Sequence, residues 1–480
     1  MNTVQRIAKN MMVLITARIL SMLFGFFYVM YTARYLGPAN YGILAFALAL
    51  NGIFGVITNF GLDPLTVREV ARDKSLAKKY LANGIVLKLT FGVLTFLLVF
   101  GVVYLLGYPD ITRKVVYIIT LSTVVNGINN LFNDVYQAFE RMEFMSIGQI
   151  LGGSALSLVF AVIAIKLGLN VVHFAMIPLA VSLILLVYHA IITTWKFLKP
   201  KVEVDVGFWR STLREAWPFA LTAVFVSIYY WIDSVMLSYM KGDEVVGWYN
   251  AAYRLVLILL VIPGIYFTSL YPLMSRFFKD SKDSLRFTFE RSFKYMSMLA
   301  FPIGVGTTLL ADRIILFIFG PAYLPSAKAL QILVWSVVCI YLSSPYGQLV
   351  RSANRQGVET KITAMGAVLN TVLNAIIIPK WSYVGASSTT LATELFVTLF
   401  YFYTFRKTEF FGPLILIHMG RAMVASIIMG AFIWFFPRLN LLLIIGSSIT
   451  IYFITYYALN GVDVTDKKII KELKGGVKAR

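Results

Sequence analysis

The chain of 480 residues is 59% hydrophobic and only 14% charged, with a mean hydropathy of +0.77. A soluble protein of this length could not cover so much apolar surface with so few charges, so the composition excludes a soluble globular protein. The single cysteine, Cys339, excludes a disulfide framework within the chain and a cysteine zinc site, and three histidines far apart in the sequence do not suggest a metal site.

Apolar segments long enough to cross a bilayer follow one another along the whole chain. An α-helical span needs about 20 predominantly apolar residues. The pattern therefore predicts an all-α polytopic membrane protein with about 14 transmembrane helices. We place these helices at residues 11–32, 41–62, 80–106, 115–137, 146–167, 170–195, 216–239, 246–270, 293–319, 328–350, 360–379, 383–405, 414–436 and 440–459.

The basic residues are unevenly distributed over the connections between these helices. With the N-terminus in the cytoplasm, 30 of the 43 Lys and Arg residues fall on the cytoplasmic side, 9 on the outer side and 4 within spans. Because cytoplasmic loops of membrane proteins carry the excess of Lys and Arg, both termini are predicted to be cytoplasmic, in the cell membrane. This topology, with contact to anionic membrane lipids, accounts for the net charge of +20 without nucleic acid.

Two halves of the chain look related. The turns Gly37–Gly42 and Gly242–Gly247 have the same glycine spacing, and Glu140 corresponds to Asn354 at an offset of 214 residues. Parallel repeats of this kind place a substrate site between the halves. The predicted organisation is an N-terminal six-helix lobe over 1–200, a C-terminal six-helix lobe over 201–408, and two additional helices with a basic cytoplasmic tail over 409–480.

The first span carries an arginine near its middle. An arginine at bilayer depth costs roughly 2.5–3.5 kcal/mol on insertion scales, so a chain that keeps Arg18 there is expected to use it. Tyr28 lies on the same helical face. Because a guanidinium can donate two parallel hydrogen bonds to a phosphate, Arg18 and Tyr28 are candidate substrate-binding residues. The alternative is a structural arginine paired with an acid or with carbonyls.

Span four carries a polar stripe of Asn126, Asn129, Asn130, Asn133 and Gln137. Amides both donate and accept hydrogen bonds, so the stripe suits sugar hydroxyls or a water-filled cavity. Hydrogen bonds between helices explain it equally well. Asn126, Asn130 and Asn133 are the candidate substrate-binding residues of this span.

Spans seven and eight contribute Asp233, Asn250 and Arg254. Arg254 is a candidate second phosphate ligand and Asn250 a candidate substrate-binding amide, whereas an Asp233–Arg254 ion pair is the structural alternative. An ionisable residue inside the membrane must pair or face a cavity. Asp233, Glu394 in span twelve and Lys88 in span three are therefore candidates for ion coupling or for structural ion pairs.

Five segments follow one another along the chain in an order that is typical of a known family, at residues 33–42, 67–73, 138–143, 231–237 and 246–255. They resemble the polysaccharide-transport (Wzx-type) flippases of the multidrug/oligosaccharidyl-lipid/polysaccharide exporter superfamily, and the similarity runs essentially from end to end. The resemblance implies two six-helix lobes with alternating access, and export of undecaprenyl- or dolichyl-linked oligosaccharide diphosphates to the outer leaflet. In such proteins cationic residues of the central cavity are thought to hold the diphosphate, and Arg18 and Arg254 stand where these are expected.

Two other functions are alternatives to a flippase, one of them a different transporter and the other an enzyme. A multidrug/cation antiporter of the same superfamily favours an acid in the first half, where this chain has Arg18. A membrane polysaccharide polymerase or glycosyltransferase needs a substantial outer loop, and the predicted outer loops are short. No phosphate-binding loop or other soluble-enzyme motif is present. We therefore expect a transporter rather than an enzyme, with no cofactor and no metal. Its expected partners are a polyprenyl-diphosphate-linked oligosaccharide, anionic membrane lipids and the glycosyltransferases or polymerase of the same pathway.

Overall fold

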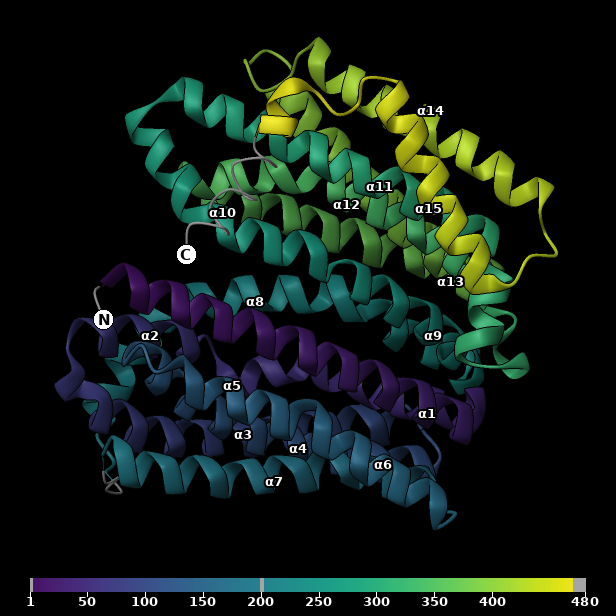
Figure 1. Cartoon of the computed structure of the whole chain (residues 1–480). Coiled ribbons are helices and arrows are strands. Elements are labelled where there is room, and N and C mark those ends of the chain that lie inside the picture. The colour runs from purple at the N-terminus through teal and green to yellow at the C-terminus, as the bar shows by residue number, and fades with distance from the viewer. Residues whose placement is uncertain (1–2, 199–202, 469–480) are drawn as a thin grey trace. The chain divides into compact units, whose positions relative to one another are not determined.

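The computed structural model describes residues 3–198 and 203–468 (Figure 1). These ranges contain 15 α-helices and no β-strand. They include 11 helical stretches long and apolar enough to cross a membrane, one of which, Asp243–Asp280, comprises two of the 15 helices. Two of the helices, α1 (Thr3–Asn59) and α13 (Gln356–Phe405), are each interrupted by one non-helical residue, Gly37 and Ser382, and so consist of two helices. The all-α class is confirmed, and the helices agree with about 14 spans.

The chain forms two compact units. Unit 1 comprises Met1–Ala251 and Thr363–Ala386, and unit 2 comprises Ala252–Ile362 and Ser387–Arg480. The predicted lobe boundary at residue 200 and the end of the basic tail, residues 469–480, lie outside the described residues.

The helices follow one another with short connections. Unit 1 also contains α2 (Leu62–Arg72), α3 (Ala77–Leu105), α4 (Asp110–Ala138), α5 (Met142–Ile150), the π-helical turn η2 (Leu151–Ala155), α6 (Leu156–Lys166), α7 (Val171–Lys196), α8 (Val206–Lys241) and most of α9 (Asp243–Leu259). Unit 2 contains α10 (Val261–Asp280), α11 (Lys282–Ile318), α12 (Ser326–Ser352), α14 (Pro413–Phe435), α15 (Leu441–Ala458) and much of α13.

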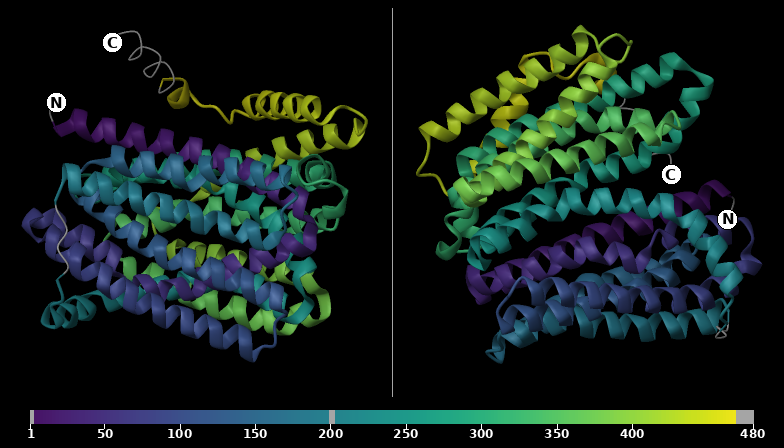
Figure 2. Two further views of the ribbon diagram at one scale, coloured as in Figure 1. Left: turned by 90° about the horizontal axis from the view of Figure 1, so that it is seen from below. Right: turned by 180° about the vertical axis from the view of Figure 1, so that it is seen from behind.

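In unit 1, α4 lies at the centre of the helix packing and runs beside α3 and α7 (Figures 1 and 2). Its buried face carries Leu131, Phe132 and Tyr136, around which aromatic and aliphatic side chains of neighbouring helices pack. The Tyr136 hydroxyl shares a 2.9 Å hydrogen bond with the Thr193 hydroxyl of α7. This bond gives the phenol a polar partner inside an otherwise apolar contact.

In unit 2, α11 packs against α12 and α14, and the segment after α15 folds back onto α11. Arg291 Nη1 lies 2.5 Å from Asp463 Oδ2, and the Tyr295 hydroxyl donates to Asp466 Oδ1 at 2.9 Å. The fully buried ammonium of Lys294 pairs with both of these carboxylates. We call Asp463 and Asp466 with Arg291 and Lys294 the C-terminal clamp.

Left-handed backbone positions recur at the offset of 214 residues that the sequence suggested. Glu140 (φ 57°) corresponds to Asn354 (φ 56°), and Gly168 (φ 67°) corresponds to Ser382 (φ 52°). Around the first pair the hydrogen bonds match as well, since Arg141 N bonds Tyr136 O while Arg355 N bonds Val350 O. Such left-handed residues end helices. Equivalent helices in the two halves of the chain therefore end with the same left-handed backbone conformation.

The two glycine-spaced turns of the repeat contact each other. A Cβ atom on Gly42 would overlap the carbonyl oxygen of Asp243, and a Cβ atom on Gly247 would overlap the carbonyl oxygen of Pro38. Pro38 and Asp243 are themselves equivalent in the two turns, so the contact is reciprocal. Only glycine allows the two backbones to approach so closely.

Some helices extend well beyond the apolar spans. α8 begins at Val206, capped by Asp205, which accepts a 2.9 Å hydrogen bond from Phe208 N. α11 begins at Lys282, capped in the same way by Ser281. The expected starts were residues 216 and 293, because hydropathy does not register polar helical turns outside the membrane. α2, expected as a loop, is likewise a short helix with an apolar buried side.

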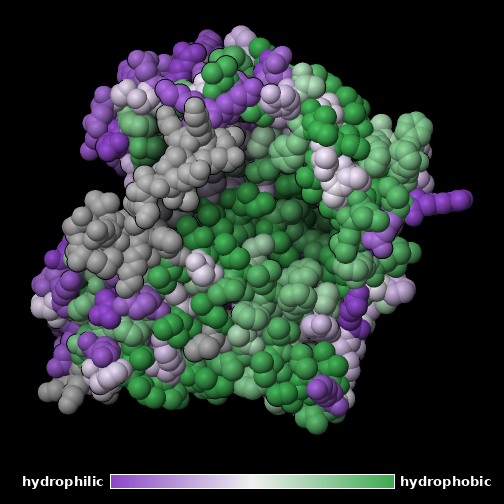
Figure 3. Space-filling model, viewed as in Figure 1, coloured by the Kyte–Doolittle hydropathy of each residue, from purple (hydrophilic) through white to green (hydrophobic). Residues whose placement is uncertain are grey.

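The surface of unit 1 agrees with a membrane environment. Hydrophobic residues cover most of the face shown in Figure 3, and hydrophilic residues gather near the end that holds α2. Leu97, Leu105 and Trp195 are among its exposed apolar side chains. Contiguous exposed apolar surface of this extent is tolerated in contact with lipid.

Candidate functional site

The helix face expected to carry Arg18 is largely packed inside unit 1. Ser21 Oγ donates to Gln149 O of α5 at 3.3 Å, Thr32 is buried, and Tyr28 is half-buried. Arg18 itself is exposed, next to the buried Ala17. The guanidinium makes no hydrogen bond or ion pair with the described residues of its own unit. Arg18 is thus without a partner among the described residues of unit 1, whereas Ser21 on the same face joins α1 to α5.

The amide stripe of α4 divides into two groups. Asn129 is buried and donates to Ser182 O of α7 at 2.9 Å, which makes it a helix–helix contact. Asn126, Asn130 and Gln137 are exposed, and Asn133 is half-buried with its Oδ1 unpartnered among the described residues. An exposed amide that faced hydrocarbon would lose its hydrogen bonds to water. The exposed amides of Asn126, Asn130 and Gln137 therefore fit a polar environment along this membrane-spanning helix.

Asp233 of α8 lies in a buried hydrogen-bonded cluster. The Tyr249 hydroxyl donates to Asp233 Oδ2 at 2.6 Å, and Asn374 Nδ2 of α13 donates to Asp233 Oδ1. Asn374 Nδ2 also bonds Asn370 Oδ1 at 2.9 Å. Asn250 is buried and donates to Ser234 Oγ at 3.0 Å. The structure therefore brings Asp233 and Asn250 together at the α8–α9 contact.

The remaining candidates are described within their own units. Lys88 is fully buried in unit 1, where it pairs with Asp63. Arg254 is half-buried on α9 in unit 2, and it makes no hydrogen bond or ion pair with the described residues of that unit. Glu394 is buried on α13 in unit 2, near Cys339. The ion pair expected as one alternative for Lys88 is present.

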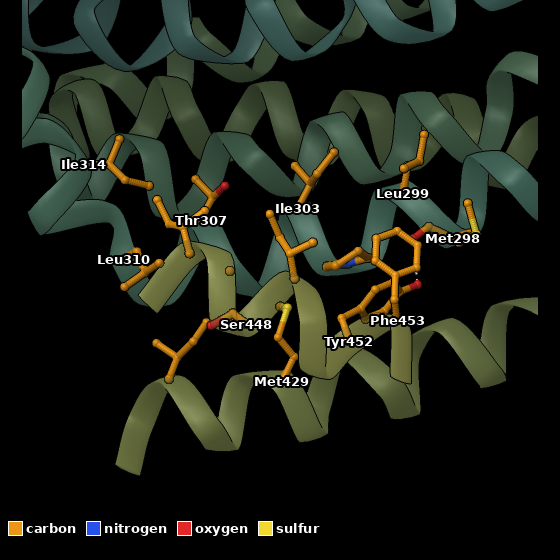
Figure 4. A pocket seen from close by; sticks show the side chains of 15 residues that line it. Met298, Leu299, Ile303, Thr307, Leu310, Ile314, Met429, Ser448, Tyr452 and Phe453 are labelled. Atoms are coloured by element: carbon orange, nitrogen blue, oxygen red, sulfur yellow. Dashed lines mark hydrogen bonds between the residues drawn. The ribbon is translucent and has the colours of Figure 1, made fainter. Parts of the chain in front are cut away.

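Unit 2 contains an apolar cavity of about 320 Å³ between α11, α14 and α15 (Figure 4). Met298, Ile303 and Leu310 of α11 face Met429 of α14 and Phe453 of α15 across it. Its polar lining atoms are few. The Tyr452 hydroxyl at its edge donates to Met298 O at 2.6 Å. The cavity therefore suits an apolar ligand.

Sequence reasoning missed three parts of this arrangement. It did not find Asp63 as the partner of Lys88, although a buried ammonium requires an acid within reach. It did not connect Tyr249 or Asn374 to Asp233, because contacts between distant helices leave no local pattern. It did not find the apolar cavity, since Leu, Ile and Met line lipid-facing and cavity-facing surfaces alike.

Comparison with known proteins defines the family. The model of the polysaccharide biosynthesis protein family matches residues 7–278, more than half of the chain. The chain belongs to this family. The MatE family model also matches residues 218–376. The resemblance expected from the sequence segments is confirmed.

Individual relatives agree over most of their length. The capsular polysaccharide biosynthesis protein CapF of Staphylococcus aureus is 23% identical over 83% of this chain and 99% of its own. The probable low-salt glycan biosynthesis flippase Agl15 of Haloferax volcanii is 21% identical over 80% of each chain. The lipid II flippase MurJ in its inward closed conformation superposes with a TM-score of 0.73 at 15% identity, over 95% of this chain and 99% of that one. The chain therefore has the fold of this class of membrane transporters.

Proposed function

We propose that this protein is a flippase that moves a polyprenyl-diphosphate-linked oligosaccharide from the cytoplasmic to the outer leaflet by alternating access of two six-helix lobes. The observation that carries the proposal is the set of exposed polar side chains inside apolar spans, Arg18 on α1 with Asn126 and Asn130 on α4. Family membership and relatives named as glycan flippases support it. A sugar headgroup cannot cross hydrocarbon unaided, so a protein must offer it a polar path.

Different residues would bind different parts of the substrate, according to their chemistry. Arg18 and Arg254 each lack a partner among the described residues of their own unit and would hold the diphosphate, because a guanidinium meets two phosphate oxygens at once. Asn126, Asn130 and Asn133, with Tyr28, would bind sugar hydroxyls. Asn250 is held by Ser234, so its contribution would be to fix the position of α9, the helix that carries Arg254.

The cavity between α11, α14 and α15 suits the other end of the same substrate. Its lining is almost entirely apolar, with Thr307, Ser448 and Tyr452 as the polar exceptions. A polyprenyl chain transferred into such a cavity keeps an apolar environment while the headgroup moves. A lipid-linked oligosaccharide therefore matches both a polar and an apolar feature of the chain.

Transport would be driven by an ion gradient that acts on an ion-binding site, or by the flow of substrate down its own gradient. Asp233, bonded by Tyr249 and Asn374, is the stronger candidate for proton or sodium coupling, with Glu394 and Lys88 as further candidates. If Asp233 couples transport, Asp233→Asn removes the dependence of flipping on the ion gradient and leaves the protein in the membrane. An unchanged dependence in Asp233→Asn and Glu394→Gln assigns both acids to structure.

The proposed location is the cell membrane, with both termini in the cytoplasm, where the substrate is assembled. Glycosyltransferases that supply the lipid-linked oligosaccharide and a polymerase that consumes it are the proposed pathway partners. The basic cytoplasmic loops would also attract the anionic substrate and anionic membrane lipids.

The proposal is tested by reconstituting the protein in vesicles with a polyprenyl-diphosphate oligosaccharide and following its accessibility in each leaflet. Arg18→Ala and Arg254→Ala should each abolish flipping at normal expression, and Lys at either position should retain part of it, because the charge remains and the planar fork is lost. Arg72→Ala, an exposed arginine of α2, is the matched control and should flip normally. Fully active Arg18→Ala and Arg254→Ala variants would show that the assignment of phosphate ligands is wrong.

A multidrug/cation antiporter is the second candidate, because the MatE family model matches residues 218–376. The same vesicles distinguish the two functions. Ion-driven uptake of a cationic drug without any movement of the lipid-linked oligosaccharide would favour the antiporter over the flippase.

A further inference from the structure

A buried group of charges lies where α2, α3 and the end of α1 meet α4. Lys88 of α3 is 0% exposed. Its ammonium donates to Asn59 Oδ1 at 3.0 Å and to Gly127 O at 2.8 Å, and it pairs with the Asp63 carboxylate. An ammonium has three donors. All three donors of Lys88 are therefore in use.

Asp134 of α4 is the second acid of this group, and it is only 8% exposed. Its Oδ2 is buried and has no hydrogen-bond partner in the part of the chain that the structure describes. Asp63 and Lys88 are the charged side chains whose fields act on it. Since Lys88 has no donor left, Oδ2 of an ionised Asp134 would stay without a hydrogen bond in a site of low dielectric constant, which is costly.

The other helices packed against α4 do not supply a compensating charge. α1 contributes the neutral amide of Asn59. His189 of α7 lies against Tyr136, with 5.5 Å between ring centroids. Glu143 of α5 pairs with Arg141. Two carboxylates beside one ammonium leave an excess negative charge, and one bound proton removes it.

We propose that Asp63 and Asp134 bind one exchangeable proton between them, with Lys88 as the counter-charge. The Asp63 side chain is 27% exposed, so it connects the buried Asp134 to water and gives the proton a way in and out. The site belongs to unit 1 alone and involves neither arginine proposed to bind phosphate. It uses none of the side chains proposed to bind the substrate, so a failure of the flippase proposal leaves it untouched.

The proton would control how firmly α2 is held. Asp63 follows Gly61, where a Cβ atom would overlap the Ala216 carbonyl oxygen of α8, and Arg68 of α2 pairs with Glu215 of α8 at 2.6 Å. When the proton leaves, the Asp134 carboxylate competes with Asp63 for Lys88. The pair that ties α2 to α3 is weakened, and the contact of α2 with α8 loosens with it.

Infrared spectroscopy of the full-length protein in lipid nanodiscs tests the proton directly. The parent protein should show the carbonyl stretch of a protonated carboxylic acid near neutral pH, and this band should shift on transfer to D2O. Asp134→Asn mimics the protonated side chain, so it is expected to fold and to lose the band. Asp110→Asn is the matched control, since Asp110 lies on the same helix and is 79% exposed, and it should keep the band. A band that persists in Asp134→Asn overturns the proposal.

A spin label on α2 tests the consequence for the helix. In a Cys339→Ala background the label replaces Arg72, whose side chain is 68% exposed. Label mobility should increase as the pH is raised in the parent and become independent of pH in Asp134→Asn. An equal pH dependence in both proteins would overturn the link between the proton and α2.

Discussion

Adjacent residues of α4 have different surroundings. Asn129 points into the bundle and bonds Ser182 O, whereas Asn130 is exposed on the next position. The sequence showed both as one polar stripe. Helical periodicity places side chains around a helix but does not say which neighbour each one meets, so the division of the stripe could not be predicted.

This division predicts opposite effects for two neighbouring substitutions. Asn129→Leu removes the bond to Ser182 O and should destabilise the protein by about 1 kcal/mol, seen as a lower thermal unfolding midpoint in detergent. Asn130→Leu should leave that midpoint unchanged and reduce flipping in vesicles, because an amide proposed to bind sugar is lost. Loss of stability in Asn130→Leu with normal flipping would contradict this assignment.

At the scale of elements, the sequence predicted the helices well and their ends poorly. Apolar length located the spans, and glycine spacing located the turns Gly37–Gly42 and Gly242–Gly247 as equivalents. It could not show that these turns contact each other, because that contact joins segments about 200 residues apart in sequence and involves backbone atoms alone. The break at Ser382 was equally hidden, since a serine rarely adopts a positive φ.

The reciprocal turn contact gives a prediction at this scale. Gly42→Ala and Gly247→Ala each insert a Cβ atom into a neighbouring backbone and should cost about 1–3 kcal/mol by overpacking. Gly101→Ala is the control, because no heavy atom lies within 4 Å of the added Cβ. Size-exclusion profiles after heating should show early loss of both turn variants and not of the control. Normal heat resistance of Gly42→Ala would exclude a tight contact at that turn.

At the scale of the whole molecule, the distribution of charge predicts orientation. The excess of Lys and Arg assigned to one side, 30 against 9, predicts that both termini lie in the cytoplasm. The structure contains no bilayer axis, so the orientation stays a prediction from the sequence. The composition could predict a membrane protein but not how its buried charges pair, which depends on helix packing.

Cysteine labelling in intact cells measures the orientation. In a Cys339→Ser background, a cysteine at position 241 should react with a membrane-impermeant maleimide added outside. A cysteine at position 282 should react only after the membrane is permeabilised. Labelling in the reverse order would place the termini on the outer side.

The C-terminal clamp has a consequence for how the gene can be engineered. Asp463 and Asp466 are the described carboxylates that neutralise the buried Lys294, and both lie after α15. A deletion that begins before Asp463 would leave a buried ammonium without its counter-charges, at a cost of roughly 3–5 kcal/mol. A fluorescent reporter or affinity tag joined after Lys468 leaves the clamp intact. The residues just after α15 are therefore part of the sequence that unit 2 needs to fold.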